Sequence, residues 1–373
     1  MGGIETVAWE LVEGQSGLGL RADVLCSNIS RKTESERAPS GYTVWRAGSW
    51  GRVLSTSVCP DMLRLAMQLC RQYDVIHVHM PDPMAALAMW FAKPNGALVV
   101  HWHSDVIRQR RSMALYQPLQ DWLLRRADAI IATSQAYADS SEPLKPWRGK
   151  VGVIPIGISD YSAKVDSQEV ARIVQRHGGR RIIFALGRMA YYKGFEFLVR
   201  AAASLPEDAV VLIGGEGEHR QPLQDEIKSL GLQSKVRLLG ALPDELLPSY
   251  FAACDLFCMP SLVRAEAYGV ATVEAMCLGR PVVSSDIPGS GLSWVNLNGV
   301  TGLTVAPADA AALAQALNTL LSDEALRSSL GKAARSRYEA ELTASAMASR
   351  TLALYQSIVA RPGLPGRRGG EPV

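Results

Sequence analysis

The sequence predicts an α/β protein of two Rossmann-like, doubly wound domains, and three observations carry this prediction. The chain has 373 residues, which suits two domains at roughly 100–200 residues each. Short runs rich in Val, Ile and Leu alternate with longer segments of helical period, as in α/β folds. Several of these runs are apolar throughout, which indicates parallel strands buried on both faces.

Eleven short runs are expected to form strands. Those in the first half are residues 21–28, 42–48, 74–79, 97–104 and 129–134. Those in the second half are residues 181–188, 209–215, 236–242, 256–262, 281–286 and 302–305. Helical patterns such as 62–72 and 194–205 lie between most of them, so each strand series forms its own α/β domain.

The repetition of the series sets the expected domain boundaries. We expect residues 1–160 to form the first Rossmann-like domain and residues 161–340 the second, with the linker near 157–165. Residues 341–360 form a last helix that could pack on either domain, and the Gly-, Pro- and Arg-rich tail 361–373 is expected to be disordered. Two such domains would face a central cleft, where the carboxyl ends of the strands bind ligands.

Composition narrows the classes of function. A net charge of only +3 argues against a nucleic-acid partner. The six cysteines contain no C-x-x-C pair and lie mostly in apolar contexts, which indicates reduced thiols and a cytoplasmic protein. No apolar run approaches the ~20 residues that span a bilayer, and the N-terminus lacks the layout of a signal peptide.

Two cations follow the strand predicted at 181–188. Arg188 comes at its end, and Lys193 comes five residues later, just before a predicted helix. Cations combined with a helix N-terminus suit a diphosphate group. The alternative is a pair of solvated surface cations.

Two glutamates, Glu266 and Glu274, lie eight positions apart after the strand predicted at 256–262. The helix between them is expected to begin near Gly269 or Val270 and to run to Leu278. Carboxylates beside an anion site would bind a sugar, because they accept strong hydrogen bonds from its hydroxyls. The alternative is one glutamate stabilised by the helix dipole and one exposed glutamate.

Two further short motifs are candidate binding elements. In the motif "HWHSD", His101 and His103 would point the same way. No third ligand stands at metal-site spacing, so no metal site is predicted; His103 is the candidate for contact with a reacting sugar, and a structural histidine is the alternative. The motif "GGIE", residues 2–5, opens a helix directly, and its glycines would let the backbone approach a phosphate.

The segment from Arg108 to Arg126 mixes arginines with Leu, Tyr, Trp and Met. This composition is typical of an interfacial patch on an anionic membrane. An ordinary surface helix with one apolar face is the alternative.

These motifs together resemble those of the retaining glycosyltransferases of family 4, which have the two-domain GT-B fold. The resemblance extends to about residue 355 and is carried by "EAYGVATVEAMCLGRPVV", "GRMAYYKG", "GGEGE", "VRLLGAL" and "NGVTGL". The motifs "HWHSDVIRQ", "LYQPLQ" and "YYKG" are most similar to those of bacterial α-mannosyltransferases that build surface polysaccharides.

The resemblance implies roles for the catalytic candidates His103, Arg188, Lys193 and Glu266. Arg188 and Lys193 would hold the diphosphate of a nucleotide-sugar donor, and Glu266 would hold the hydroxyls of its hexose. His103 would contact the hexose from the first domain.

The resemblance also implies the remaining contacts. Glu274 would accept hydrogen bonds from the ribose, and the backbone around Tyr268, Gly269 and Val270 would position sugar and phosphate. Gly3 would approach the diphosphate, and Glu5 would face the acceptor. The first domain would bind the acceptor and the second the donor, and the last helix would cross back to the first domain.

The implied activity is transfer of a hexose, with mannose from GDP-mannose expected, to a lipid-linked or growing glycan of a surface polysaccharide. The configuration would be retained, and no metal or other cofactor is expected because the sequence has no D-x-D motif. The enzyme would be cytoplasmic and peripheral on the inner face of the plasma membrane. A sugar-nucleotide epimerase of the same fold and a catalytically silent nucleotide-binding subunit are the alternatives.

The chain departs from the family pattern at its start. Family members carry a central strand before the glycine loop, whereas here Gly2 and Gly3 directly follow Met1. We therefore expect the first strand to be missing and the true start to lie upstream.

Overall fold

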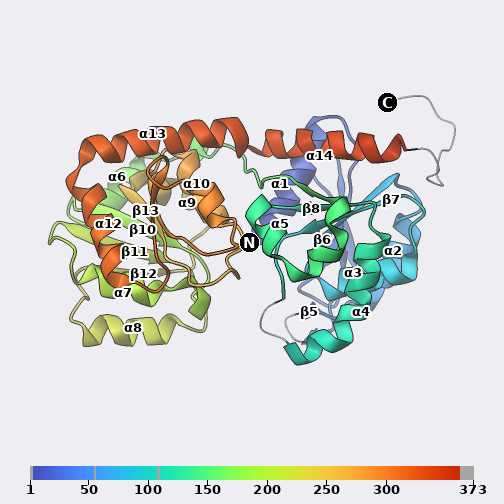
Figure 1. The fold of residues 1–373 in the computed structure, drawn as a ribbon, viewed down its shortest axis with the longest axis horizontal. Helices are drawn as coiled ribbons and strands as arrows, with labels where there is room; N and C mark the ends of the chain where they lie inside the picture. Colours follow the sequence, from blue (N-terminus) through green and yellow to red (C-terminus); the bar gives the residue numbers. More distant parts are fainter. Residues whose placement is uncertain (1–2, 54–55, 107–109, 362–373) are drawn as a thin grey trace. The chain divides into compact units, whose positions relative to one another are not determined.

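The computed structural model describes residues 3–53, 56–106 and 110–361. Contacts between Cα atoms divide the chain into two compact units (Figure 1). The first unit comprises residues up to Ile156 together with those from Ala344 onward, and the second comprises Gly157–Thr343. The tail that follows Arg361 lies outside the described residues.

The first unit contains two sheets and a short hairpin. A parallel sheet has the order β6-β7-β8-β9, and its strands are β6 (Val75–Met80), β7 (Ala97–Trp102), β8 (Ala129–Ala132) and β9 (Val151–Val153). A smaller sheet has the order β1-β3-β2, with β1 (Val24–Ser27), β3 (Thr43–Ala47) and the antiparallel β2 (Glu34–Arg37). The hairpin is β4 (Arg52–Val53) with β5 (Thr56–Ser57).

All five strands predicted in the first half are present, but four others were not predicted. They are β2, β4, β5 and β9. Strand β2 is "ESER", and all four of its residues are exposed, so it carries no apolar signal. It is a strand only because its backbone forms hydrogen bonds with β3. In the described part of the chain no strand pairs with both β1 and β6, and each of these two has one neighbour.

The helices of the first unit pack around these sheets. They are α1 (Gly3–Gly17), α2 (Pro60–Leu69), α3 (Pro83–Ala92), α4 (Arg110–Arg126), α5 (Gln135–Ser140), the 3-10 segment η1 (Glu142–Lys150) and α14 (Ala344–Val359). Helix α14 lies beside α1 although more than 320 residues separate them (Figure 1). Gly14 permits this approach, because a Cβ there would lie 2.7 Å from the Cβ of Ala348.

The second unit contains one parallel sheet of six strands, as the sequence predicts. Its order is β12-β11-β10-β13-β14-β15, formed by β10 (Arg181–Leu186), β11 (Ala209–Gly214), β12 (Val236–Gly240), β13 (Leu256–Met259), β14 (Val282–Ser285) and β15 (Gly302–Val305). The chain builds outward from β10 to β12 and then returns to place β13 on the other side of β10. The strand order therefore reverses between β10 and β13.

Helices and 3-10 turns precede, connect and follow these strands (Figure 1). They are η2 (Ser162–Lys164), α6 (Ser167–Arg176), η3 (Tyr191–Lys193), α7 (Phe195–Ala202), α8 (Arg220–Ser229), α9 (Leu247–Ala253), α10 (Val270–Cys277), α11 (Leu292–Val295), α12 (Ala310–Ser322) and α13 (Glu324–Glu341). Every residue of β11, β13 and β14 is buried, which confirms that this sheet is covered on both faces.

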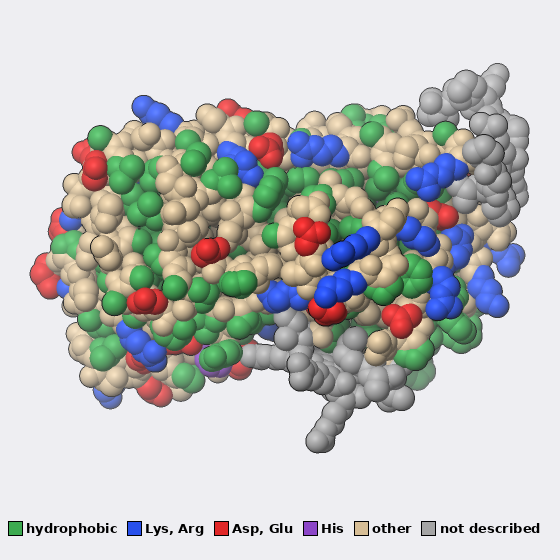
Figure 2. Space-filling model, in the orientation of Figure 1, with side chains coloured by type: hydrophobic (Ala, Val, Ile, Leu, Met, Phe, Trp, Pro, Cys, Tyr) green, Lys and Arg blue, Asp and Glu red, His purple; other side chains and the backbone are tan. Residues whose placement is uncertain are grey.

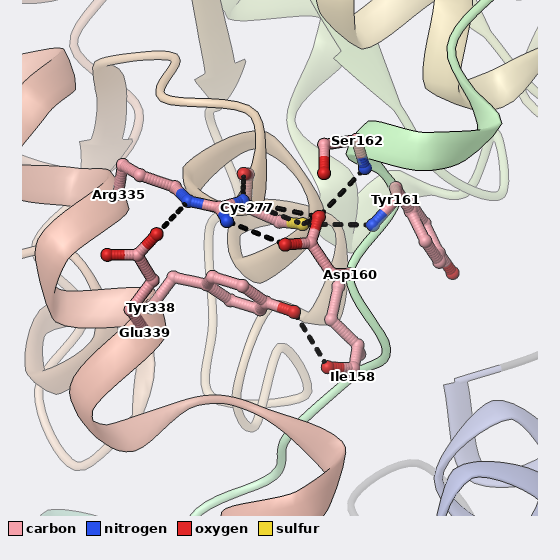
Figure 3. A network of polar contacts seen from close by, with 8 residues as sticks. All are labelled: Ile158, Asp160, Tyr161, Ser162, Cys277, Arg335, Tyr338 and Glu339. Atoms are coloured by element: carbon pink, nitrogen blue, oxygen red, sulfur yellow. Dashed lines mark hydrogen bonds and ion pairs between the residues drawn. The ribbon is translucent and has the colours of Figure 1, made fainter.

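A polar network fastens the start of the second unit to its last long helix (Figure 3). The Asp160 carboxylate accepts a hydrogen bond of 2.6 Å from Arg335 of α13, and the same guanidinium donates to the carbonyl of Cys277 at the end of α10. The hydroxyl of Tyr338 donates to the carbonyl of Ile158 at 3.0 Å. Three segments far apart in sequence are thus joined beside the unit boundary.

Candidate functional site

The candidate site of the second unit lies at the point where its strand order reverses. In open α/β sheets, ligands bind outside the carboxyl ends of the strands at such a point. The segment after β10 contains Arg188 and η3, and the segment after β13 contains Glu266 and leads into α10. Because β10 and β13 are neighbours in the sheet, their following loops are also neighbours.

Lys193 and Glu266 meet at this edge. Nζ of Lys193 lies 2.5 Å from Oε2 of Glu266, and the same oxygen accepts a 3.0 Å hydrogen bond from the hydroxyl of Ser261. Burial by itself would lower the pKa of Lys193, but the charge and hydrogen bond of Glu266 outweigh it and raise the pKa. The lysine is therefore held in its charged form inside the protein.

Arg188 is the exposed member of the cation pair. Its guanidinium lies 6.0 Å from the centroid of the Tyr192 ring, at the outer limit for a cation–π contact. Its positive charge opposes protonation of Lys193, which places the two cations within electrostatic reach. An anion that contacts both would relieve this repulsion.

The "GGEGE" turn supports the segment that carries these cations. The amide of Met189 donates to the carbonyl of Glu216 at 2.8 Å, and the amide of His219 donates to the carbonyl of Met189 at 2.9 Å. In the sequence this turn is one of the motifs that carry the family resemblance. In the structure its backbone braces the turn after β10.

The helix after Glu266 begins as the sequence predicts. Helix α10 starts at Val270 and ends at Cys277, with Gly269 as its N-cap and Leu278 as its C-cap. Gly269 has a φ of +82°, and a Cβ there would lie 2.7 Å from Cδ1 of Leu292, so this turn strongly favours glycine. Tyr268 is buried beside it, and the first turn of α10 leaves backbone N–H groups for an anion.

Glu274 lies in the middle of α10 and is 8% exposed. The hydroxyl of Tyr161 donates to its Oε1 at 3.4 Å. The sequence gave no signal for Tyr161, because 113 residues separate the two partners. Both glutamates are buried, so the alternative in which one of them is an exposed surface residue is wrong.

The other predicted site residues lie in the first unit. Gly3 and Glu5 occupy the first turn of α1, and both are exposed. His103 follows β7 directly and is buried. The structure therefore brings Lys193 and Glu266 into contact, with Arg188, Gly269 and Glu274 on the same unit, whereas His103, Gly3 and Glu5 belong to the other.

His103 is part of a cluster of four histidines. His77 and His79 of β6 join His101 and His103 on one face, since His79 is in register with His101 across the parallel pair. Nδ1 of His79 lies 2.9 Å from Nε2 of His103, and the His101 and His103 rings stack at 4.2 Å. The sequence interpretation found no partner for "HWH". The matching signal was "HVH" at residues 77–79, one strand earlier.

Part of the predicted membrane segment forms helix α4. Arg108 and the side chains up to Leu115 lie outside the described residues. Arg126 donates to the Asp128 carboxylate at 2.9 Å and to the carbonyls of Pro94 and Gly96. This arginine therefore ties the helix to the fold. Among the described helices, none combines the length and apolar character needed to cross a bilayer.

Known proteins resemble this chain over nearly its whole length. A family model described as Glycosyltransferase Family 4 matches residues 1–160, and one described as Glycosyl transferases group 1 matches residues 166–337. The O-antigen chain mannosyltransferase C of Escherichia coli is 33% identical over 360 residues, which cover 96% of this chain and 95% of that protein. The chain is a family 4 glycosyltransferase.

Two further proteins extend this comparison. The D-rhamnosyltransferase WbpZ of Pseudomonas aeruginosa is 33% identical to the glycosyltransferase over 92% of this chain and 89% of its own length. The structure of Anabaena HepE in complex with UDP-glucose superposes with a TM-score of 0.79, at 22% identity and 96% coverage of both chains. The glycosyltransferase has the GT-B fold, as the resemblance implied.

Proposed function

We propose that this glycosyltransferase moves a mannosyl residue from GDP-mannose to a lipid-linked or growing glycan of a surface polysaccharide, with retention of configuration. The observation that carries the proposal is the contact between Lys193 and Glu266 at the carboxyl ends of β10 and β13. Two relatives of equal identity, a mannosyltransferase and a D-rhamnosyltransferase by name, support a donor of the mannose type.

The charges of the site suit the bond that breaks. As the sugar leaves the diphosphate, negative charge grows on the leaving nucleotide. Arg188, Lys193 and the N–H groups at the start of α10 would stabilise it, and one well-placed donor contributes about 2.7–4 kcal/mol in comparable sites. Glu266 would release part of its hold on Lys193 and accept hydrogen bonds from the hexose hydroxyls. His103 would contact the hexose from the first unit, where Gly3 would approach the diphosphate and Glu5 the acceptor.

Because Arg188 and Lys193 would neutralise the charge of the diphosphate in place of a divalent ion, we propose that transfer needs no added Mg²⁺ or Mn²⁺. The test is the initial rate in dialysed protein with and without either ion. A rate that depends on added Mg²⁺ or Mn²⁺ would refute this part of the proposal.

The donor is tested by binding of GDP-mannose, GDP-D-rhamnose, UDP-glucose and ADP-glucose, measured by calorimetry. We expect GDP-mannose to bind tightest. The two GDP sugars differ in the hydroxyl at carbon 6, so tighter binding of GDP-D-rhamnose would move the proposal to that donor. Binding of a UDP or ADP sugar alone would overturn it.

The two alternative functions are separated by product analysis. A transferase releases GDP only when an acceptor is present, whereas an epimerase converts one nucleotide sugar into another without an acceptor. A silent subunit would bind the nucleotide and do neither. We expect GDP release that depends on a mannose-terminated acceptor.

We also propose that the enzyme acts on the cytoplasmic face of the plasma membrane, docked through the segment from Arg108 to Arg126. Helix α3 packs beside α4, and its Trp90 and Phe91 are 43% and 53% exposed. Trp90 meets Trp122 of α4 at 5.0 Å between ring centroids. Figure 2 also shows Lys and Arg side chains gathered over part of the first unit. Aromatic residues beside cations favour an anionic bilayer surface.

Flotation with liposomes tests this docking. We expect binding to liposomes that contain phosphatidylglycerol, a loss of binding at high salt, and weaker binding of the variant Trp90→Ala/Phe91→Ser. The matched control is Val300→Ser, which alters an exposed apolar side chain of the second unit. Absence of binding to these liposomes would refute docking through the segment from Arg108 to Arg126, and equal flotation of all three proteins would refute a part for the aromatic side chains of α3.

A further inference from the structure

Three of the clustered histidines have the arrangement of a metal site. The candidate ligand nitrogens of His77, His79 and His101 all lie within 4.8 Å of one another. Zn²⁺ bound tetrahedrally at 2.0–2.1 Å needs its ligand nitrogens about 3.3 Å apart. The three residues share one face of β6 and β7, so an ion bound there would draw their rings toward a common point.

His101 is the most unusual member of the group. It is fully buried, and neither of its ring nitrogens has a hydrogen-bond partner. Buried polar side chains in folded proteins nearly always have a partner. A bound ion would supply one.

A hydrogen bond at Nδ1 of His77 fixes the orientation of its ring. Its Nδ1 lies 2.5 Å from the hydroxyl of Tyr355 in α14, and Gln15 of α1 donates to that same hydroxyl at 3.1 Å. If Nδ1 carries the proton, the lone pair lies on Nε2, which is buried and has no partner. Histidines that bind metals typically donate the N–H of their other nitrogen in this way.

His79 completes the set. Its Nδ1 is engaged with His103, so Nε2 is the nitrogen with which it would bind. Neutral imidazole is the form that binds a metal.

We propose that His77, His79 and His101 form a binding site for one transition-metal ion, with Zn²⁺ as the expected occupant. Imidazole ligands suit Zn²⁺, Cu²⁺ or Ni²⁺, whereas Mg²⁺ takes oxygen ligands. The ligands of this site therefore differ from those of a Mg²⁺ ion that would hold a donor diphosphate. The ion would join β6 and β7, beside His103.

The test uses the full-length protein after dialysis against a chelator. Co²⁺ is added while visible absorption is recorded, and Zn²⁺ is then titrated by calorimetry. We expect one ion per chain and an absorption spectrum of nitrogen ligands. Thiolate-to-metal charge transfer would instead show binding by cysteine, such as Cys59 or Cys70 of the same unit, and would overturn the proposal.

Variants then assign the ligands. We expect His101→Gln to bind Zn²⁺ at least tenfold more weakly and Tyr355→Phe, which keeps the ring and removes the hydroxyl, about 10- to 100-fold more weakly. His219→Gln, in the second unit, is the matched control and should bind as the unaltered protein does. Because Tyr355→Phe is nearly isosteric, it remains informative if His101→Gln fails to fold. Absence of binding by the unaltered protein, or unchanged affinity in both variants, would refute the site.

Discussion

Nζ of Lys193 lies 2.5 Å from Oε2 of Glu266, and the two side chains are only 11% and 10% exposed. A buried charge pair of this kind need not stabilise a protein, because removing both charges from water costs about as much as their attraction returns. Its value here is positional. It holds a cation and a carboxylate together at the edge of the sheet. A ligand that contains both a diphosphate and hydroxyls can bind the lysine through the first and the glutamate through the second.

Removal of one partner should destabilise the second unit strongly. Lys193→Met leaves Glu266 buried without its cation, and we expect a cost of about 3–5 kcal/mol in the free energy of unfolding. The double variant Lys193→Met/Glu266→Gln should cost less than the sum of Lys193→Met and Glu266→Gln. Urea unfolding of the four proteins measures this coupling, and strict additivity would show that the pair carries no interaction.

The same pair has a defined pH dependence. Because the pKa of Lys193 is raised, its stabilising contribution is fully present below the ordinary lysine value of 10.5 and is lost as pH rises through the folded value. The stability difference between the unaltered protein and Lys193→Met should therefore stay constant near neutral pH and shrink only in strong alkali. A difference that already falls between pH 6 and pH 8 would contradict the assignment.

Glu274→Gln should weaken nucleotide binding through the ribose. A hydrogen bond to a charged group contributes about 1.5–3 kcal/mol, so we expect at least a tenfold loss of affinity for GDP. The loss should disappear with 2′,3′-dideoxy-GDP, which lacks the hydroxyls that the carboxylate would accept from. Calorimetry with both nucleotides makes the comparison. An equal loss for both would remove Glu274 from the ribose.

Gly269→Ala should disturb the start of α10 more than its φ alone predicts. A non-glycine residue in the left-handed region costs about 1–2 kcal/mol, and the contact with Leu292 adds about 1–3 kcal/mol of overpacking. Gly299→Ala is the control, since Gly299 has a φ of +72° with open space around it. Thermal unfolding should rank Gly269→Ala as the less stable variant, and GDP-mannose binding should fall in it alone.

The pair of Asp160 and Arg335 should contribute stability that is lost in acid. The hydrogen bond from Arg335 is the main reason why the pKa of Asp160 lies below its ordinary value of 3.8. The contribution is therefore present above pH 3.8 and disappears as pH falls through the lower folded value. Since the pair is partly exposed, Asp160→Asn should cost only about 0.5–1 kcal/mol at neutral pH.

Unfolding in urea between pH 2 and pH 7 checks this prediction. The difference between the unaltered protein and Asp160→Asn should narrow below pH 4. Asp244→Asn, at an exposed position, should show no such trend. A difference that stays constant down to pH 2 would contradict the role of Arg335.

The sequence by itself determined where the buried apolar strands form. Burial on both faces leaves apolar runs that can be read directly, so all eleven predicted strands are present, and the bounds of α10 follow from Gly269 and Gly279. Strand β2 was not predicted because its four residues are exposed and form no apolar run. Such local patterns depend only on neighbours in the chain.

Only the tertiary structure decided which of these segments meet. Lys193 and Glu266 are 73 residues apart and come together because β13 returns to the side of β10. His77 reaches Tyr355 across 278 residues because α14 packs in the first unit. Pairings of this kind follow from strand order and helix packing, which depend on the burial of the whole chain and leave no periodic trace in the residues that they join.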